Sequence, residues 1–201
     1  MPDAFSMCLL TKGGTLSLGV DYSKDSRFRW TDITQEQWYT VTLNDIKFGS
    51  QSIGVSSWDL NENGVIVDSG TTLFIVTTDV MTAINATLYS LCKTTNLIGI
   101  CNAPKGQTLF DGQCFNMTSA QTAQFPTLTL TLDGLGDLTV QPTDYLWQGA
   151  GIPGAYCLGI QGMDGNGIII GDVIMQRYHV VFDRYNSKVG FGPLSSCPSL
   201  E

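Results

Sequence analysis

One run of the chain combines a short apolar segment, an acid and a turn: Val65-Ile66-Val67-Asp68-Ser69-Gly70-Thr71-Thr72-Leu73. Three β-branched residues in a row predict a buried strand. Gly70 allows a tight turn after the acid and leaves its N–H free to point at the Asp68 carboxylate. The hydroxyls of the flanking Ser and Thr residues can orient that carboxylate. The run therefore predicts a strand with a positioned carboxylate at its tip, although Asp-Ser-Gly alone is also a common turn.

This run resembles the active-site signature of the pepsin-like aspartic proteases, Asp-Ser/Thr-Gly-Ser/Thr between hydrophobic residues. Four further segments match that family in its order: GGTLSLG at 13–19, WYTV at 38–41, IIG at 169–171 and YHVVFDRYNSKVGFG at 178–192. The resemblance implies an all-β fold, mainly β with a few short helices. It would be a pepsin-like lobe, a partly open β-barrel with a ψ-loop in which the Ile-Ile-Gly strand lies beside the catalytic strand.

The resemblance also implies a mechanism and roles for individual residues. In this family a water held between two carboxylates attacks the peptide bond, and the two acids share a proton because both cannot ionise readily side by side. No metal or organic cofactor is required. The implied site comprises Asp68 as the catalytic acid; Gly70, Thr71, Thr72 and Trp38 as substrate-binding residues; and Ser69, Ile170 and Gly171 as support for the active site.

The chain contains only one such acid motif, whereas a full pepsin-like enzyme has two lobes that each supply one acid. The pairs Asp111-Gly112 and Asp133-Gly134 predict hairpin turns instead, and no equivalent of the first-lobe flap is found. The sequence therefore predicts one domain over 3–199, the C-terminal lobe, with 1–2 and 200–201 as expression-vector residues. The implied partners are an N-terminal lobe, from the same precursor or a separate chain, and a peptide or protein substrate.

Six cysteines indicate an oxidising compartment. No Cys-x-x-Cys spacing occurs and the chain has one histidine, which argues against a zinc site. Many pairings are possible from the sequence alone. The positions resemble those of the beta-secretase branch of the family, and this resemblance implies three disulfides: Cys8–Cys197, Cys114–Cys157 and Cys92–Cys101.

Composition and sequons bear on the location of the protein. Charged residues make up 14% of the chain and the net charge is −8, which argues against nucleic acid and anionic membrane surfaces as partners. No apolar run is long enough to span a bilayer. Asn85-Ala86-Thr87 and Asn116-Met117-Thr118 are N-glycosylation sequons. We expect a glycoprotein that is secreted or resides in the endo-lysosomal or vacuolar lumen.

The rest of the sequence predicts elements around these motifs. An apolar face of Val80, Ile84, Leu88 and Leu91 predicts a helix over 78–92 with Thr78 or Asp79 as its cap. Strict alternation predicts a strand over 125–132. We also expect strands up to about 53, loops over 58–64 and 92–112, and a short helix over 142–146.

Three other features are expected to have structural roles and not catalytic or binding roles. His179 lies in an apolar strand without a Ser-His-Asp framework, so we expect a packed strand residue. The glycines of 162–167 lack a following Lys-Ser/Thr and predict a hairpin turn, not a phosphate cradle. Asp172 is expected to cap a short helix over 173–178, with no catalytic role.

Three functions from different classes remain open at this point. The first is a protease half-site in which Asp68 acts only with an N-terminal lobe. The second is a homodimeric protease of the retroviral type, in which two copies pair their Asp68 side chains about a two-fold axis. The third is a non-catalytic lobe that binds a peptide or a partner.

Overall fold

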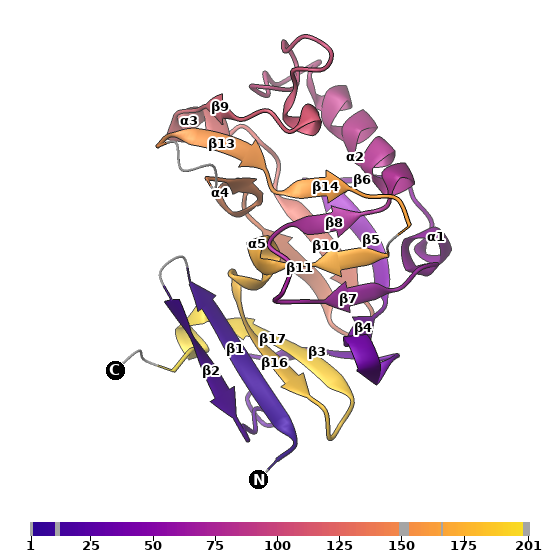
Figure 1. The fold of residues 1–201 in the computed structure, drawn as a ribbon, viewed down its shortest axis with the longest axis vertical. Helices are drawn as coiled ribbons and strands as arrows, with labels where there is room; N and C mark the ends of the chain where they lie inside the picture. Colours follow the sequence, from indigo (N-terminus) through magenta and orange to yellow (C-terminus); the bar gives the residue numbers. More distant parts are fainter. Residues whose placement is uncertain (1, 11–12, 149–152, 166, 199–201) are drawn as a thin grey trace.

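The computed structural model describes residues 2–10, 13–148, 153–165 and 167–198, and within them the chain is mainly β with short helices (Figure 1). Residues 1 and 200–201, expected to derive from a vector, and residue 199 at the end of the expected domain lie outside the described ranges. Two regions are visible: a larger one that carries the helix α2 (Thr78–Leu91), and a five-stranded sheet next to both ends of the chain. No helix of the described residues is long and apolar enough to cross a membrane.

The central sheet of the larger region contains the ψ crossing that the sequence predicts. Its middle strand β15 runs parallel to β7 on one side and antiparallel to β8 on the other. These short strands are rich in β-branched residues because both of their faces are buried. In order across the sheet, the strands are β14 (Ile160–Gly162), β8 (Phe74–Val76), β15 (Ile168–Ile170), β7 (Val65–Val67) and β4 (Thr40–Val41).

A second five-stranded sheet is entirely antiparallel and forms the lower part of Figure 1. Its central strands are buried, whereas β2 lies at an edge and remains largely exposed. The order is β2 (Gly13–Leu18), β1 (Ala4–Leu10), β16 (Tyr178–Asp183), β17 (Lys188–Pro193) and β3 (Arg29–Asp32).

Two smaller antiparallel sheets complete the core of the larger region. The order of the first is β11 (Gly136–Val140), β10 (Leu128–Leu132), β5 (Leu43–Phe48) and β6 (Gln51–Ser52). The order of the second is β12 (Leu146–Trp147), β13 (Ala155–Leu158) and β9 (Phe115–Asn116). The remaining helical segments are α1 (Ser57–Asn61), α3 (Ser119–Thr122), α4 (Pro142–Tyr145), α5 (Asp172–Met175), and the 3₁₀ turns η1 (Glu36–Trp38), η2 (Leu109–Asp111) and η3 (Leu194–Ser196).

The two predicted helices exist, with changes at their ends. The helix over 78–92 is α2, and Thr77 caps it in place of Thr78 or Asp79, because the Thr77 hydroxyl accepts a hydrogen bond from the Val80 N–H. The helix over 142–146 is α4, which begins at a proline in the first helical position. Asp172 does not cap the helix that follows it: Gly171 holds the capping position, and α5 ends at Met175, well before residue 178.

Three predicted turns or loops have a different structure. Residues 58–64 were expected to form a loop, but most of them belong to α1, which begins after Ser56 because the Ser56 hydroxyl accepts from the Asp59 N–H at 3.2 Å. Asp111-Gly112 is not a hairpin turn: Asp111 ends η2, and its carboxylate accepts from Thr108. The glycines of 162–167 do not form a hairpin turn either, because β14 and β15 pair with opposite sides of β8.

The strand predictions also need two corrections, while one turn is confirmed. The strand expected over 125–132 begins only at Leu128. The aromatic segment 38–41 is not a continuous strand, since Trp38 belongs to η1 and Tyr39 has a left-handed backbone with φ of 49°. Asp133-Gly134 lies between β10 and β11 and is the predicted hairpin turn.

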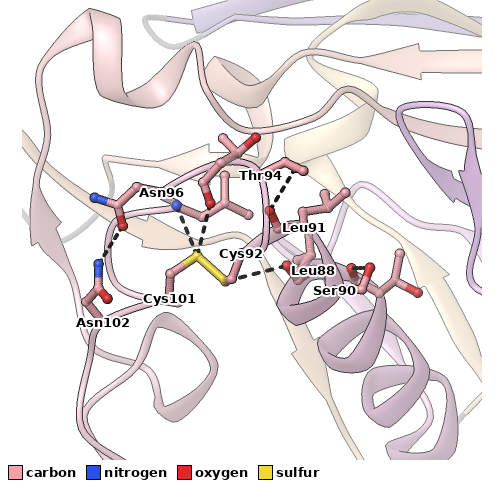
Figure 2. The surroundings of a disulfide bond; sticks show 11 residues. Leu88, Ser90, Leu91, Cys92, Thr94, Asn96, Cys101 and Asn102 are labelled. Carbon is pink, nitrogen blue, oxygen red and sulfur yellow. Dashed lines mark hydrogen bonds between the residues drawn. A yellow bond between two sulfur atoms is a disulfide. The ribbon is translucent and has the colours of Figure 1, made fainter.

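All three disulfides implied by the resemblance are present. Cys8–Cys197 joins β1 to the segment after η3 and so ties together the two ends of the chain. Cys92–Cys101 closes the segment that follows α2 (Figure 2). Within this segment the backbone N–H of Leu97 points at the Cys101 sulfur. Cys114–Cys157 joins the residue before β9 to β13.

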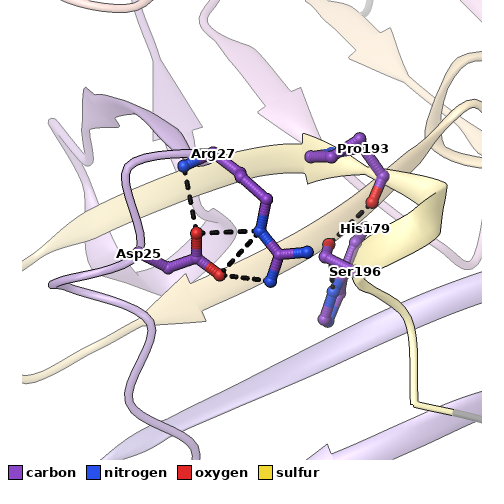
Figure 3. A network of polar contacts seen from close by, with 5 residues as sticks. All are labelled: Asp25, Arg27, His179, Pro193 and Ser196. Carbon is purple, nitrogen blue, oxygen red and sulfur yellow. Dashed lines mark hydrogen bonds and ion pairs between the residues drawn. The ribbon is translucent and has the colours of Figure 1, made fainter.

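His179 is a packed strand residue, as predicted. It is completely buried, and the rings of Tyr22 and Phe28 meet it edge-on at 4.9 and 5.2 Å. Its Nδ1 lies 3.0 Å from the Ser196 hydroxyl (Figure 3). That hydroxyl donates its only hydrogen to the Pro193 carbonyl, so Nδ1 carries the imidazole hydrogen and donates it to Ser196.

The second ring nitrogen of His179, Nε2, has no hydrogen-bond partner among the described residues. Burial therefore lowers the pKa of His179, because the protonated ring would be poorly solvated. Asp25 and Arg27, whose charges act on His179, form an ion pair with each other. The distance between Asp25 Oδ2 and Arg27 Nη2 is 2.6 Å (Figure 3).

Candidate active site

Asp68 lies directly after β7, at the point where the ψ crossing holds the chain. Its backbone N–H donates to the Ile170 carbonyl at 3.1 Å. β7 itself is fixed on both sides, by β15 on one and by β4 on the other, with Ile66 opposite Ile169 and Thr40. The backbone position of Asp68 is therefore set by three strands of one sheet.

Two local donors orient the Asp68 carboxylate. The Gly70 N–H donates to Oδ1 at 2.9 Å, and the Thr71 hydroxyl donates to Oδ2 at 2.7 Å. A Cβ at Gly70 would lie 3.1 Å from Oδ1, which is tight enough to push the carboxylate from this position. Each carboxylate oxygen thus has one partner and keeps lone pairs free for a water or a substrate.

The other residues of the motif have different surroundings. Ser69 is half-buried and Thr72 is exposed. Within the described part of the chain, neither hydroxyl makes a hydrogen bond to Asp68. The Thr72 carbonyl accepts from the Val173 N–H at 2.9 Å, which ties the turn to α5. Their roles as active-site support and substrate-binding residue stay predictions.

Gly171 is required by the packing of the turn. A Cβ at this position would lie 2.3 Å from the carbonyl oxygens of both Thr71 and Leu73, a distance that real side chains do not show. Ile170, immediately before it, has no exposed surface and provides the carbonyl that Asp68 bonds. Ile170 and Gly171 therefore lie against the Asp68 turn, and a larger residue at 171 would displace it.

Asp172 is a second carboxylate near Asp68 to which the sequence assigned only a capping role. Its backbone N–H donates to the Thr71 carbonyl at 2.8 Å. Its Oδ1 is buried without a partner among the described residues. Burial raises the pKa of Asp172, and the charge of Asp68 raises it further. The signal that could have found it is the Ile-Ile-Gly-Asp order, which brings an acid to the edge of the ψ crossing.

Trp38, predicted to contact substrate, is 58% exposed on η1, two residues before β4. The indole is available to a ligand because so much of it faces solvent. Its assignment as a substrate-binding residue stays a prediction.

Among the described residues, a group of potential metal ligands lies elsewhere, at strands β1 and β16 of the antiparallel five-stranded sheet. Cys8, His179 and Cys197 bring their ligand atoms within 4.8 Å of one another. Both sulfurs are joined in a disulfide, so neither is a thiolate that could bind a metal.

An apolar surface lies on the antiparallel five-stranded sheet, at its edge strand β2 and the neighbouring strand β1. Leu16 and Leu18 of β2 are 58% and 70% exposed. Their partners across the strand pair are Met7 and Phe5, which are half-buried on the same face. We call these four residues the β1–β2 apolar face.

Comparison with known proteins places this geometry in a family. The family model described as "Xylanase inhibitor C-terminal" matches residues 38–193. Cathepsin E of Aquarana catesbeiana is 30% identical over 190 residues, which cover 90% of this chain and 41% of that protein. Pepsin A of Bos taurus is 26% identical, covering 96% and 48%. Beta-secretase of Strongylocentrotus purpuratus is 29% identical, covering 85% and 33%.

The chain therefore spans less than half the length of these relatives. The matched model is a C-terminal domain, and the match covers more than half of the chain. The ψ crossing, the Asp-Ser-Gly-Thr turn and the disulfides agree with it. The chain belongs to the pepsin-like aspartic proteases and corresponds to their C-terminal domain.

Proposed function

We propose that the chain is one half of an aspartic endopeptidase and supplies a single catalytic carboxylate, Asp68, for peptide-bond hydrolysis. The observation that carries this proposal is the pair of hydrogen bonds from Gly70 and Thr71, which holds the carboxylate while leaving lone pairs free. A carboxylate with only a capping role would not need a rigid three-strand support.

Chemistry requires a second acid beside Asp68. In the proposed reaction, one carboxylate takes a proton from the attacking water while the other protonates or polarises the carbonyl oxygen of the peptide. We do not assign this role to Asp172, because in the family the second acid comes from the other lobe and Asp172 belongs to this one. The second acid would come from an N-terminal lobe, carried on the same precursor or on a separate chain. Gly70, Thr71, Thr72 and Trp38 would contact the peptide.

The β1–β2 apolar face supports the need for a partner lobe. Exposed leucines at adjacent positions of one strand face are costly in water, and their burial favours association. We propose that this face packs against the N-terminal lobe. The three disulfides fit a secreted or lumenal protein, and the sequons fit a glycoprotein.

The experiment that tests the proposal measures cleavage of a quenched peptide library between acidic and neutral pH. The chain alone is expected to show negligible turnover, and the chain mixed with its N-terminal lobe is expected to cleave peptides at acid pH. Asp68→Asn should abolish this activity with the fold intact, because the amide keeps the shape and loses the base. Asp133→Asn, in an exposed hairpin turn, changes the net charge equally and is the control.

Two other outcomes would replace the proposal. Turnover by the lone chain that grows with the square of its concentration would favour the homodimer, in which two copies pair Asp68. Turnover that survives Asp68→Asn would refute the assignment of the catalytic acid.

A second candidate is a non-catalytic binding lobe, favoured by the description of the matched family model as that of an inhibitor. An intact Asp-Ser-Gly-Thr turn with both of its donors in place weighs against it. Titration with a transition-state-mimicking peptide inhibitor, with and without the N-terminal lobe, separates the two. A protease half-site binds it only with the lobe and through Asp68, whereas a binding module would be indifferent to Asp68→Asn.

A further inference from the structure

Two sequons occur in the chain, and the structure gives them opposite surroundings. We propose that the folded chain carries an N-linked oligosaccharide at Asn116 and none at Asn85. The inference rests on the secretory location proposed above, since the transferring enzyme works only in that pathway.

Asn116 is an exposed residue of β9, an edge strand of its three-stranded sheet. Thr118 lies two residues beyond the strand, where it caps α3 with an extended backbone. Both Asn116 and Thr118 are exposed, whereas Met117 between them is 7% exposed. The acceptor amide and the required hydroxyl therefore lie together on the solvent side.

Thr118 can act in the sequon without loss of its structural role. Its hydroxyl caps α3 and accepts from the Gln121 N–H at 3.3 Å. The cap needs an oxygen at this position, and serine provides one as well as threonine. A Thr118→Ser change would therefore preserve both the cap and the sequon.

Asn85 lies within α2, where the same triplet has a different geometry. Residues i and i+2 of a helix point about 200° apart around its axis, so Asn85 and Thr87 face different directions. Thr87 is 5% exposed and packs into the core side. The Asn85 Oδ1 is buried and has no partner among the described residues. A glycan on Asn85 would require the carboxamide to leave its place.

The modification is a group transfer from a lipid-diphosphate-linked oligosaccharide. The Asn116 side-chain nitrogen attacks the anomeric carbon of the first sugar and a C–N bond forms. The bond between that carbon and the diphosphate oxygen breaks, the lipid diphosphate leaves with the electron pair, and the amide loses one proton. No electrons are exchanged with any other reactant.

A glycan at Asn116 would leave the proposed function intact. β9 lies at the opposite end of the molecule from β1 and β2 (Figure 1). The sugar would therefore not cover the β1–β2 apolar face. It would instead lie at the outer edge of β9, the last strand of its sheet.

The test is secretion of the full chain from a eukaryotic host, followed by enzymatic removal of N-glycans in heavy-oxygen water and peptide mapping. Each occupied asparagine becomes an isotope-labelled aspartate. The label is expected at 116 and not at 85, in disulfide-bonded protein from both medium and cells. Asn116→Gln should remove the single glycan mass shift, Thr118→Ala should do the same, and Thr118→Ser and Asn85→Gln should retain it.

An isotope label at 85 in disulfide-bonded chain, or none at 116, would overturn the inference. Because the readout is a mass and not an activity, its failure is distinct from failure of the protease assignment. A label at 116 in a chain that does not cleave peptides with its N-terminal lobe would refute only the protease assignment.

Discussion

Removal of each disulfide should destabilise the chain in an order set by the length of the loop that it closes. A cross-link lowers the entropy of the unfolded chain more when the joined residues are farther apart. The separations are 189 residues for Cys8–Cys197, 43 for Cys114–Cys157 and 9 for Cys92–Cys101. The loop-closure relation gives losses in the free energy of unfolding of about 5, 4 and 3 kcal/mol respectively.

The structure adds a local reason for the size of the first loss. Cys8 is 1% exposed in β1, and its partner Cys197 lies directly after η3, near the end of the described chain. Without the bond, the segment after η3 is no longer tied to β1. Loss of about 5 kcal/mol is comparable to the whole stability of many domains. The Cys8→Ala/Cys197→Ala chain is therefore expected to be largely unfolded at 37 °C.

The assay is urea denaturation of three paired Cys→Ala variants, followed by intrinsic tryptophan fluorescence. Paired removal avoids a free thiol that could form a wrong bridge. The expected order of midpoints, from highest to lowest, is the Cys92/Cys101 pair, the Cys114/Cys157 pair and the Cys8/Cys197 pair. Equal midpoints, or a Cys8/Cys197 variant as stable as the parent chain, would refute the argument from loop length.

The other predictions concern the site, the partner face and the buried histidine. Thr71→Val removes the donor to Asp68 Oδ2 and should lower kcat/KM of the reconstituted enzyme about 10- to 100-fold, a loss of about 1.5–3 kcal/mol for a charged hydrogen bond, whereas Thr71→Ser keeps a hydroxyl at this position and should retain most of the activity. Leu16→Glu with Leu18→Glu should weaken binding of the N-terminal lobe at least about tenfold in sedimentation, while Ser17→Glu on the other face of β2 should have less effect. The free energy of unfolding should fall as the pH drops below about 6.5, because the imidazole of His179 binds a proton at a higher pH in the unfolded chain than in the folded one. Urea denaturation between about pH 7.5 and pH 6 should show this fall. The same pH dependence in His179→Asn would contradict the assignment to His179.

The ψ crossing could be predicted from the sequence because its signals are local. Two runs of β-branched residues form the strands Val65–Val67 and Ile168–Ile170. Each run is followed directly by a residue that marks the end of the strand, Asp68 in the first case and Gly171 in the second. The cap of α1 was equally local, since Ser56 with Asp59 three residues later is a helix-start pattern, and it was missed because 58–64 looked polar and turn-rich.

What could not be predicted depends on contacts between distant segments. The loop over 162–167 looked like a hairpin because consecutive strands usually pair, yet β14 and β15 are separated by β8, which comes from earlier in the chain. Nothing in the spacing of the cysteines alone selects their pairing, which followed from the family resemblance.

Asp68 is held in place by its own chain. Every bond that fixes the acid comes from within the lobe: Gly70 and Thr71 hold the carboxylate, and Ile170 holds its backbone. The position of the carboxylate therefore does not depend on a partner. Under the proposed function, an N-terminal lobe would supply a second acid and cover a carboxylate that is already positioned, and for this reason Asp68→Asn should cost activity without loss of lobe association.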